Sequence, residues 1–160
     1  MRLRRLGAIL GAALLVVSAF VTPARAADSS VGTWKVNLAK SKYDPGPAPK
    51  GPNTLKIEAD GDGIKVTNDG VDAQGQKTHV TYSAKYDGKD YPETGNPNVD
   101  TIALKRIDAN TVQTTTKKGG KVMVTSKVVV SADGKTRTTT QDGTDAAGKK
   151  VHNVIVAEKQ

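Results

Sequence analysis

Polar and apolar residues alternate along most of this chain, and no other feature limits its possible folds as strongly. Near the start, Trp34, Val36 and Leu38 fall on one face of an extended segment, and the residues between them are polar. The same period of two recurs in residues 55–59, 80–86 and 122–130. This period is typical of strands with one buried face. Beyond residue 26 no stretch carries apolar residues at helical spacing over three turns, so the sequence predicts an all-β protein.

Turn-forming residues separate the alternating runs at intervals of about ten to fourteen residues, as at Asp60–Gly63, Asp87–Gly88 and Asp133–Gly134. Glycine adopts the positive φ of tight hairpins, and Asp accepts hydrogen bonds from the turn backbone. The pattern predicts an antiparallel up-and-down meander of about 8–10 strands in a closed or nearly closed barrel. Nine strands are expected, at residues 31–39, 53–59, 63–70, 76–86, 99–107, 111–117, 121–131, 135–142 and 149–158.

Two segments fall outside this rhythm. Residues 44–52 carry four prolines and predict an extended, polyproline-like loop across one end of the barrel. Residues 91–98 carry Pro92, Gly95 and Pro97 and predict a second irregular loop.

Residues 1–26 have the pattern of a signal peptide. A basic start with Arg2, Arg4 and Arg5 precedes an apolar run over residues 6–21. Small residues then stand at the positions that favour cleavage between Ala26 and Ala27. We expect a helical signal peptide that is removed, leaving residues 27–160 as a single domain. The protein is then exported, periplasmic or extracellular, with no stable membrane insertion after cleavage.

The charge balance argues against a nucleic-acid partner. The chain has 24 Lys and Arg against 16 Asp and Glu, a formal charge of +8. Four of these arginines lie within residues 1–26, so the remainder carries only +4, and its lysines alternate with acidic residues. The positions expected to face outward are polar, which excludes the apolar band of an outer-membrane barrel. The absence of cysteine excludes disulfides and thiolate metal sites.

Part of the sequence occurs twice. Residues 59–79 and 132–152 align without gaps at an offset of 73, with eleven of 21 positions identical. The alignment defines repeat units at residues 53–86 and 126–159. Unrelated hairpin turns share Asp and Gly because both residues favour turns. This preference does not explain why His79 and His152 also match. We therefore favour a three-strand unit used twice.

No constellation of residues predicts catalysis or metal binding. His79 and His152 share a repeat position, but neither has a carboxylate or a second His at ligand spacing, and two ligands rarely suffice for a metal. Both are therefore expected on the solvent face, and no metal or cofactor is predicted. A G-x-S-x-G nucleophile motif and a Gly-rich phosphate loop are both missing. We assign no catalytic residue and do not expect an enzyme.

Gly32-Thr33-Trp34 opens the first expected strand and resembles the G-x-W start of the lipocalins and the related fatty-acid-binding proteins, the calycins. In that superfamily the Trp plugs one end of a barrel that carries a small apolar ligand. The resemblance implies a lipocalin-like barrel over residues 27–160. Residues 32–49 also resemble the opening of a group of exported bacterial proteins of unknown function, a resemblance that implies no activity.

The chain departs from these families in two ways. It lacks the helical lid of the fatty-acid-binding proteins, and the proline loop stands in its place. The lipocalin Arg that packs on the Trp has no counterpart, since the last strand offers only Lys150 and Lys159. Beyond residue 26 the only arginines are Arg106 and Arg137, and neither can be assigned as the buried Arg that holds a fatty-acid carboxylate.

Side-chain volume gives an independent argument. Large residues must fill the interior of a closed barrel, or the interior stays open for a ligand. This chain has one Trp, and its one Phe lies within residues 1–26. Either the barrel encloses a cavity or it flattens until its valine faces touch. The composition leaves both open.

If a cavity exists, strand parity predicts eight lining residues: Trp34, Leu38, Ile57, Val66, Tyr82, Tyr86, Ile102 and Leu104. The hydroxyl groups of the two tyrosines would orient a polar head group. The predicted function is binding or carriage of a small apolar or amphipathic molecule without chemistry. The alternative is a non-catalytic envelope module that binds another protein, of unknown identity, through its surface or an edge strand.

Overall fold

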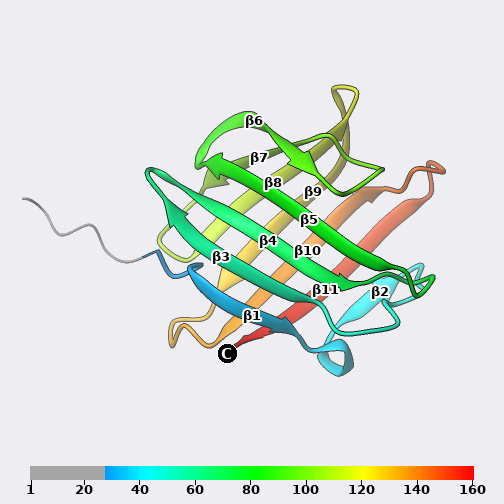
Figure 1. Cartoon of the computed structure of the whole chain (residues 1–160), viewed down its shortest axis with the longest axis horizontal. Helices are drawn as coiled ribbons and strands as arrows, with labels where there is room; N and C mark the ends of the chain where they lie inside the picture. The colour runs from blue at the N-terminus through cyan, green and yellow to red at the C-terminus, as the bar shows by residue number, and fades with distance from the viewer. Residues whose placement is uncertain (1–27) are drawn as a thin grey trace, which may run out of the picture.

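The computed structural model describes residues 28–160, which form β-strands and one short 3-10 helix (Figure 1). The elements are β1 (Gly32–Val36), η1 (Leu38–Lys40), β2 (Lys42–Asp44), β3 (Thr54–Asp60), β4 (Gly63–Val71), β5 (Lys77–Lys85), β6 (Asp87–Thr94), β7 (Thr101–Arg106), β8 (Thr111–Lys118), β9 (Lys121–Val130), β10 (Thr136–Thr144) and β11 (Lys150–Lys159). The all-β prediction is confirmed. The predicted signal peptide and the cleavage site between Ala26 and Ala27 lie outside the described residues.

The sheet closes on itself. From β3 to β11 each strand pairs with the next along the chain, and β1 pairs with both β3 and β11. At the closing seam Trp34 lies opposite Lys159 and Val36 opposite Ala157. Ten antiparallel strands, β1 and β3–β11, therefore form a closed up-and-down barrel, as predicted. Because β1 pairs with β11, the strand left at the end of the described sheet is the three-residue β2.

The first strand is interrupted, so the predicted strand over residues 31–39 is wrong beyond Val36. After Asn37 the chain stops pairing with β11 and forms η1. It then forms β2, which pairs with β11 again, with Asp44 opposite His152. Side chains stabilise this step: the Asn37 Oδ1 atom accepts a hydrogen bond from the Lys40 N–H at 3.2 Å. The Ser41 hydroxyl donates to the Asn37 carbonyl at 2.8 Å and accepts from the Val156 N–H at 3.0 Å.

Strand β6 occupies part of the segment predicted as an irregular loop over residues 91–98. Pro92 lacks an N–H, which normally argues against a strand interior. Here β5 and β6 pair only at Thr81–Thr94 and Tyr82–Glu93, so the β5 side requires no hydrogen bond from Pro92. The other side of β6 pairs with β7, where Pro92 lies opposite Thr101.

Two hairpins are built alike. Strand β10 begins and ends 73 positions after β4, which is the offset of the sequence repeat. In the turn after β4, the Asp72 Oδ1 atom accepts from two N–H groups at 2.9 and 2.7 Å. In the turn after β10, the Asp145 Oδ1 atom does the same at 2.9 Å in both bonds. The common origin of the two units stays a prediction.

The barrel has two different ends. The turns at residues 60–63, 107–111 and 131–135 form what we call the closed end, and the turns at 72–76, 119–120 and 145–148 with the proline loop form the open end (Figure 1). Large buried side chains gather toward the closed end: Trp34, Ile57, Ile64, Leu104, Val112 and Val130. Within residues 28–160 no helix is long and apolar enough to span a membrane.

Lys159 covers Trp34 at the closing seam. The Trp34 side chain is completely buried, and its Nε1 atom donates to the Ser30 carbonyl at 2.8 Å. The Lys159 Nζ atom lies 5.1 Å from the centre of the Trp34 ring, within the range of a cation–π contact. Gly32 leaves room for it, because a Cβ atom there would lie 2.5 Å from Lys159 Cε. Lys159 thus packs on Trp34, in the role for which the sequence has no arginine on the last strand.

Candidate functional site: a cavity at the open end of the barrel

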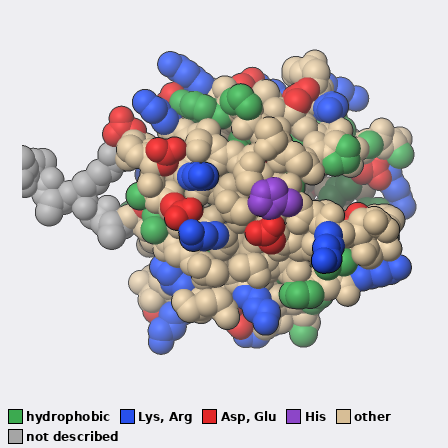
Figure 2. Space-filling model, viewed as in Figure 1, with side chains coloured by type: hydrophobic (Ala, Val, Ile, Leu, Met, Phe, Trp, Pro, Cys, Tyr) green, Lys and Arg blue, Asp and Glu red, His purple; other side chains and the backbone are tan. Residues whose placement is uncertain are grey.

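A cavity of about 370 Å³ lies inside the barrel toward the open end. Each of the eleven strands contributes at least one inward side chain to its wall, because alternate residues of a strand face inward. Tyr43, Pro49, Asn53 and Asn96 belong to the wall near the mouth. The surface is hollowed on the right of Figure 2, where the open end lies. Of the two alternatives that the composition left open, the structure therefore shows the first. The barrel encloses a cavity, and its valine faces do not meet.

Three of the eight residues that parity selected, Val66, Tyr82 and Ile102, line this cavity. Another three, Trp34, Ile57 and Leu104, are buried in the packed closed end and do not line it.

The last two lie elsewhere. Leu38 belongs to η1 and borders a separate hollow on the outside of the barrel. Tyr86 stands at the closed end, where its hydroxyl is bonded to Asp28. The assignment of the eight as a ligand site stays a prediction.

The cavity wall is more polar than the sequence analysis expected. It includes amide, hydroxyl and charged side chains beside valine, leucine and isoleucine. The polar members are Asn53, Asn68, Glu93, Asn96, Thr114, Thr116, Ser126, Arg137, Thr139 and Gln141.

Arg137 is the cation of the cavity. Neither Arg106 nor Arg137 could be assigned to a buried site from the sequence, but the structure places Arg137 on the wall, from strand β10. Its Nη1 atom donates to the Thr139 hydroxyl at 3.0 Å, and its buried Nε atom has no hydrogen-bond partner among residues 28–160. Burial lowers the pKa of Arg137, while Tyr82 and Tyr86 act in the opposite direction. The guanidinium nevertheless stays protonated at neutral pH.

Two acceptors stand on other strands. Glu93 on β6 is buried and accepts one hydrogen bond, from Asn96 Nδ2 to its Oε1 atom at 3.3 Å. Burial raises the pKa of Glu93, and the bond from Asn96 offsets only part of this effect. Asn68 on β4 has a buried Oδ1 atom without a partner among the described residues.

Tyr82 responds to both charged residues. Burial raises its pKa to about 12; the Arg137 guanidinium lowers it and the Glu93 carboxyl raises it. The phenol therefore stays protonated at neutral pH and available as a donor.

Hydroxyl and amide groups form a row across the wall. Thr114 on β8 lies opposite Ser126 on β9, which lies opposite Gln141 on β10. The Gln141 Oε1 atom accepts from Asn153 Nδ2 at 3.1 Å, which extends the row to β11. These groups both donate and accept, so this side of the cavity suits a ligand with polar substituents.

Asp28 ties the chain to the closed end. Its Oδ2 atom accepts from the Tyr86 hydroxyl and from Arg106 Nη2, both at 2.6 Å, and its Oδ1 atom accepts from the Ser30 N–H at 2.9 Å. Arg106 also stacks on Tyr86, with its Cζ atom 3.8 Å from the ring centre. Burial alone would raise the pKa of Asp28, but the bonds from Tyr86 and Ser30 together with Arg106 outweigh it and lower the pKa. This cluster is structural, since its polar groups satisfy one another.

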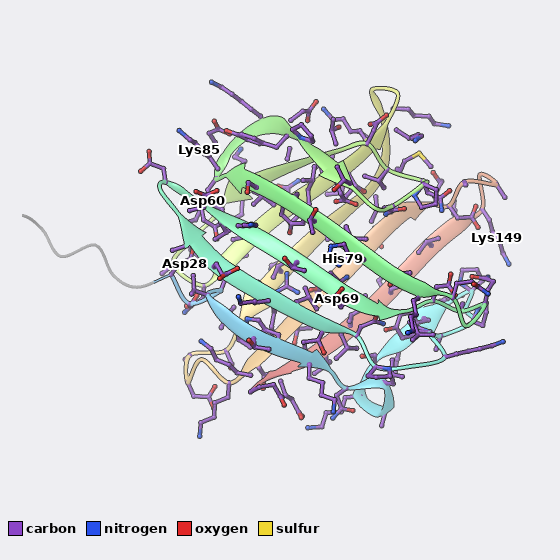
Figure 3. All side chains as sticks on the ribbon, in the orientation of Figure 1. Asp28, Asp60, Asp69, His79, Lys85 and Lys149 are labelled. Carbon is purple, nitrogen blue, oxygen red and sulfur yellow. The ribbon has the colours of Figure 1, made fainter. Side chains whose placement is uncertain are left out.

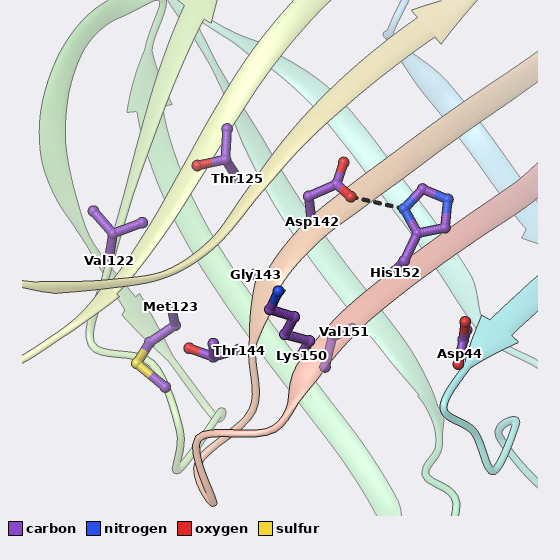
Figure 4. Close-up of a pocket in the computed structure, with 10 residues that line it drawn as sticks. All are labelled: Asp44, Val122, Met123, Thr125, Asp142, Gly143, Thr144, Lys150, Val151 and His152. Carbon is purple, nitrogen blue, oxygen red and sulfur yellow. Dashed lines mark hydrogen bonds and ion pairs between the residues drawn. The ribbon is translucent and has the colours of Figure 1, made fainter.

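A second hollow lies on the outer wall beside β9, β10, β11 and β2 (Figure 4). Its lining includes Met123, Thr125, Asp142 and His152, which alternate with inward residues and therefore face outward. The hollow is larger, about 770 Å³, but it is open to solvent and holds no buried polar atom without a partner. The interior cavity is therefore the stronger candidate site.

Both histidines form exposed pairs with an aspartate on the adjacent strand. His79 Nδ1 lies 2.6 Å from Asp69 Oδ1 (Figure 3), and His152 Nδ1 lies 2.7 Å from Asp142 Oδ1. The His79 side chain is 66% exposed. Within residues 28–160 no three His, Asp or Glu side chains come together in a way that would hold a metal ion.

Comparison with known proteins shows the fold and no closer relationship. No protein-family model matches the chain, and no curated protein matches its sequence. Among solved structures, zebrafish ileal bile acid-binding protein in complex with cholic acid is 11% identical with a TM-score of 0.50, covering 82% of this chain and 99% of that one. The S-type phycobiliprotein lyase CPES from Guillardia theta is 12% identical with a TM-score of 0.51, covering 82% and 88%. The chain therefore shares its barrel fold with these two proteins.

Proposed function

We propose that this protein is exported and binds a small amphipathic molecule inside its barrel, without chemistry. One observation carries the proposal: a 370 Å³ cavity whose wall combines apolar side chains with a buried guanidinium nitrogen that has no partner among the described residues. Pockets of this size, mostly apolar with a few placed polar groups, are typical of small-ligand sites. A buried donor without a partner is costly, and a ligand acceptor would remove that cost.

One of the two similar structures supports the binding of a small molecule, because it is a complex with cholic acid. The alternative function, binding of another protein through the surface or an edge strand, has less support: β1 and β11 pair with each other, and the strand at the end of the described sheet, β2, is only three residues long. Residues 1–26 support export, and intact-mass analysis of the secreted protein tests it, with Ala27 expected as the first residue.

The binding experiment uses 1-anilinonaphthalene-8-sulfonate, an amphipathic anion whose fluorescence rises in apolar surroundings. The purified protein is titrated with the probe, and decanoate is then added to displace it. Ser126 lines the cavity and Thr125, its neighbour on β9, faces the outer hollow. We expect Ser126→Phe to abolish binding and Thr125→Phe to leave it unchanged. Binding that survives in Ser126→Phe and is lost in Thr125→Phe would place the probe on the outer wall and contradict the proposal.

A further inference from the structure

One donor and two acceptors of the cavity wall stand on opposite sides of the barrel. Around the ten-strand barrel, Arg137 on β10 is four strands away from Glu93 on β6 in one direction and four strands from Asn68 on β4 in the other. The donor therefore stands on one wall and the two acceptors stand on the wall across from it. All three side chains line the same cavity.

These groups do not satisfy one another. Arg137 forms no ion pair with Glu93, and among residues 28–160 the side-chain partner of Glu93 is Asn96, at 3.3 Å. The Asn68 Oδ1 atom and the Arg137 Nε atom are the two buried side-chain atoms without a hydrogen-bond partner among residues 28–160. One is an acceptor and the other is a donor, so a purely anionic or a purely apolar ligand would satisfy at most one of them.

Tyr82 stands on the wall of the two acceptors, between the strands that carry Asn68 and Glu93. It lies on β5, directly across the barrel from β10, and its ionisation is affected by both Arg137 and Glu93. Its neighbour in the register with β6 is Glu93. A ligand that reaches from Arg137 to Glu93 therefore passes beside the Tyr82 phenol, a flat apolar surface with one hydroxyl group.

We propose that the ligand is an amphipathic anion with a hydrogen-bond donor, a hydroxyl or amino group, at the side opposite its anionic group. The anionic group binds Arg137, and the donor binds Asn68 and Glu93. This inference rests on the proposed function and specifies the ligand of the same cavity. The polar row of Thr114, Ser126 and Gln141 contacts further polar substituents on the ligand.

The test compares three chains of equal length by competition against 1-anilinonaphthalene-8-sulfonate and by calorimetry: decanoate, 10-hydroxydecanoate and 1,10-decanediol. The series is repeated with eight and twelve carbons, so that a mismatch in length does not decide the result. We expect the hydroxy acid to bind roughly fivefold more tightly than the plain acid, the advantage of one added hydrogen bond. The diol, which lacks the anion, is expected to bind at least as weakly as the plain acid.

Variants locate the two interactions. Asn68→Leu keeps the size of the side chain and removes the acceptor, so the advantage of the hydroxy acid over the plain acid should fall below twofold. Arg137→Gln should remove the preference for the hydroxy acid over the diol. Thr67→Val, one residue before Asn68 on β4 and on the other face of the strand, is the control and should change neither ratio. Glu93→Met, which removes both carboxylate oxygens, is the second acceptor variant and carries the test alone if Asn68→Leu does not fold, as judged by thermal unfolding.

The outcomes separate the inference from the proposed function. If decanoate binds as tightly as 10-hydroxydecanoate at every length, the donor requirement is wrong and the cavity remains a binding site. If the hydroxyl advantage persists in both acceptor variants, Asn68 and Glu93 do not bind the donor and the inference is wrong. If none of the probes binds at millimolar concentration, both proposals are wrong.

Discussion

Asp28 and Arg106 form an ion pair 2.6 Å long between residues 78 positions apart. The Asp28 side chain is 19% exposed, so the pair is largely shielded from water. It joins the start of the described chain to the end of β7, and the Tyr86 hydroxyl bonds to the same carboxylate oxygen. Removing this carboxylate would leave both Tyr86 and Arg106 without their acceptor. We therefore expect the stability of the closed end to depend on Asp28.

We expect Asp28→Ala to lower the free energy of unfolding at pH 7 by about 1–3 kcal/mol, the cost of leaving buried donors without a partner. The folded protein holds the pKa of Asp28 below its ordinary value, so its contribution is present above the unfolded pKa of about 3.9 and is lost as pH falls through the folded pKa. Urea unfolding at pH 7 and at pH 3 measures both effects. Asp60→Ala, at an exposed turn, is the control; an equal loss in both variants would contradict the prediction.

Gly32→Ala should destabilise the barrel by about 1–3 kcal/mol, because Gly32 has φ +137° and an added Cβ would overlap Lys159 Cε. Gly88→Ala is the matched control: it also has a positive φ, +77°, but nothing lies within 4 Å of the added Cβ. In a Lys159→Ala background the cost at Gly32 should fall toward that at Gly88. Thermal unfolding of the four variants measures this, and equal costs at the two glycines in the parent protein would exclude a role for the Lys159 contact.

Glu93→Gln should make the protein more stable at pH 7 and leave its stability unchanged at pH 4. Burial raises the pKa of Glu93, so the folded state holds this proton more firmly than the unfolded state. Stability therefore decreases as pH rises from the unfolded pKa of about 4.3 through the folded pKa. Urea unfolding at several pH values measures the effect. Glu58→Gln, an exposed carboxyl whose pKa Lys56 lowers, should give no gain; stabilisation of equal size there would show that burial of Glu93 is not the cause.

Leu104→Ala should cost about 2–5 kcal/mol, because Leu104 is 1% exposed and packs among the large side chains of the closed end. Ile107→Ala, three residues later and 54% exposed, should cost less than about 0.5 kcal/mol. Urea unfolding compares the two. Similar costs would mean that the closed end is not the main packed region of the barrel.

The fold was largely predictable because its signals are local. Alternation places one face of each strand inward, and Asp and Gly fix the hairpin turns, as at Asp72 and Asp145. Strand β6 was missed because Gly88 and Pro92 break the local pattern, and pairing with β7 overrides it. The break after Val36 was missed because it depends on the hydrogen bond between Ser41 and Val156, residues distant in the sequence.

The cavity was less predictable than the fold. Strand β10 has no apolar alternation, since Thr occupies both faces and Arg137 and Gln141 stand on the inward one, so parity alone does not show which face is inside. Only the strand register shows that Arg137 points into the barrel. Arg137 pairs with Val130 on β9, and paired residues face the same side of the sheet as the buried Val130. Strand parity also does not show where along the barrel packing ends and the cavity begins, so Trp34 and Val66 were predicted together and lie in different parts of the interior.

Both ends of the described chain are attached to the closed end. Asp28 bonds to Tyr86 and Arg106 there, and the Gln160 N–H donates to the Thr33 carbonyl at 2.9 Å beside the start of β1. Figure 1 shows the C-terminus on the same side of the barrel as the start of the coloured chain. A tag, a surface linker or a fused fluorescent protein joined after Gln160 therefore points away from the cavity mouth, so the immobilised protein keeps that mouth open to the solution.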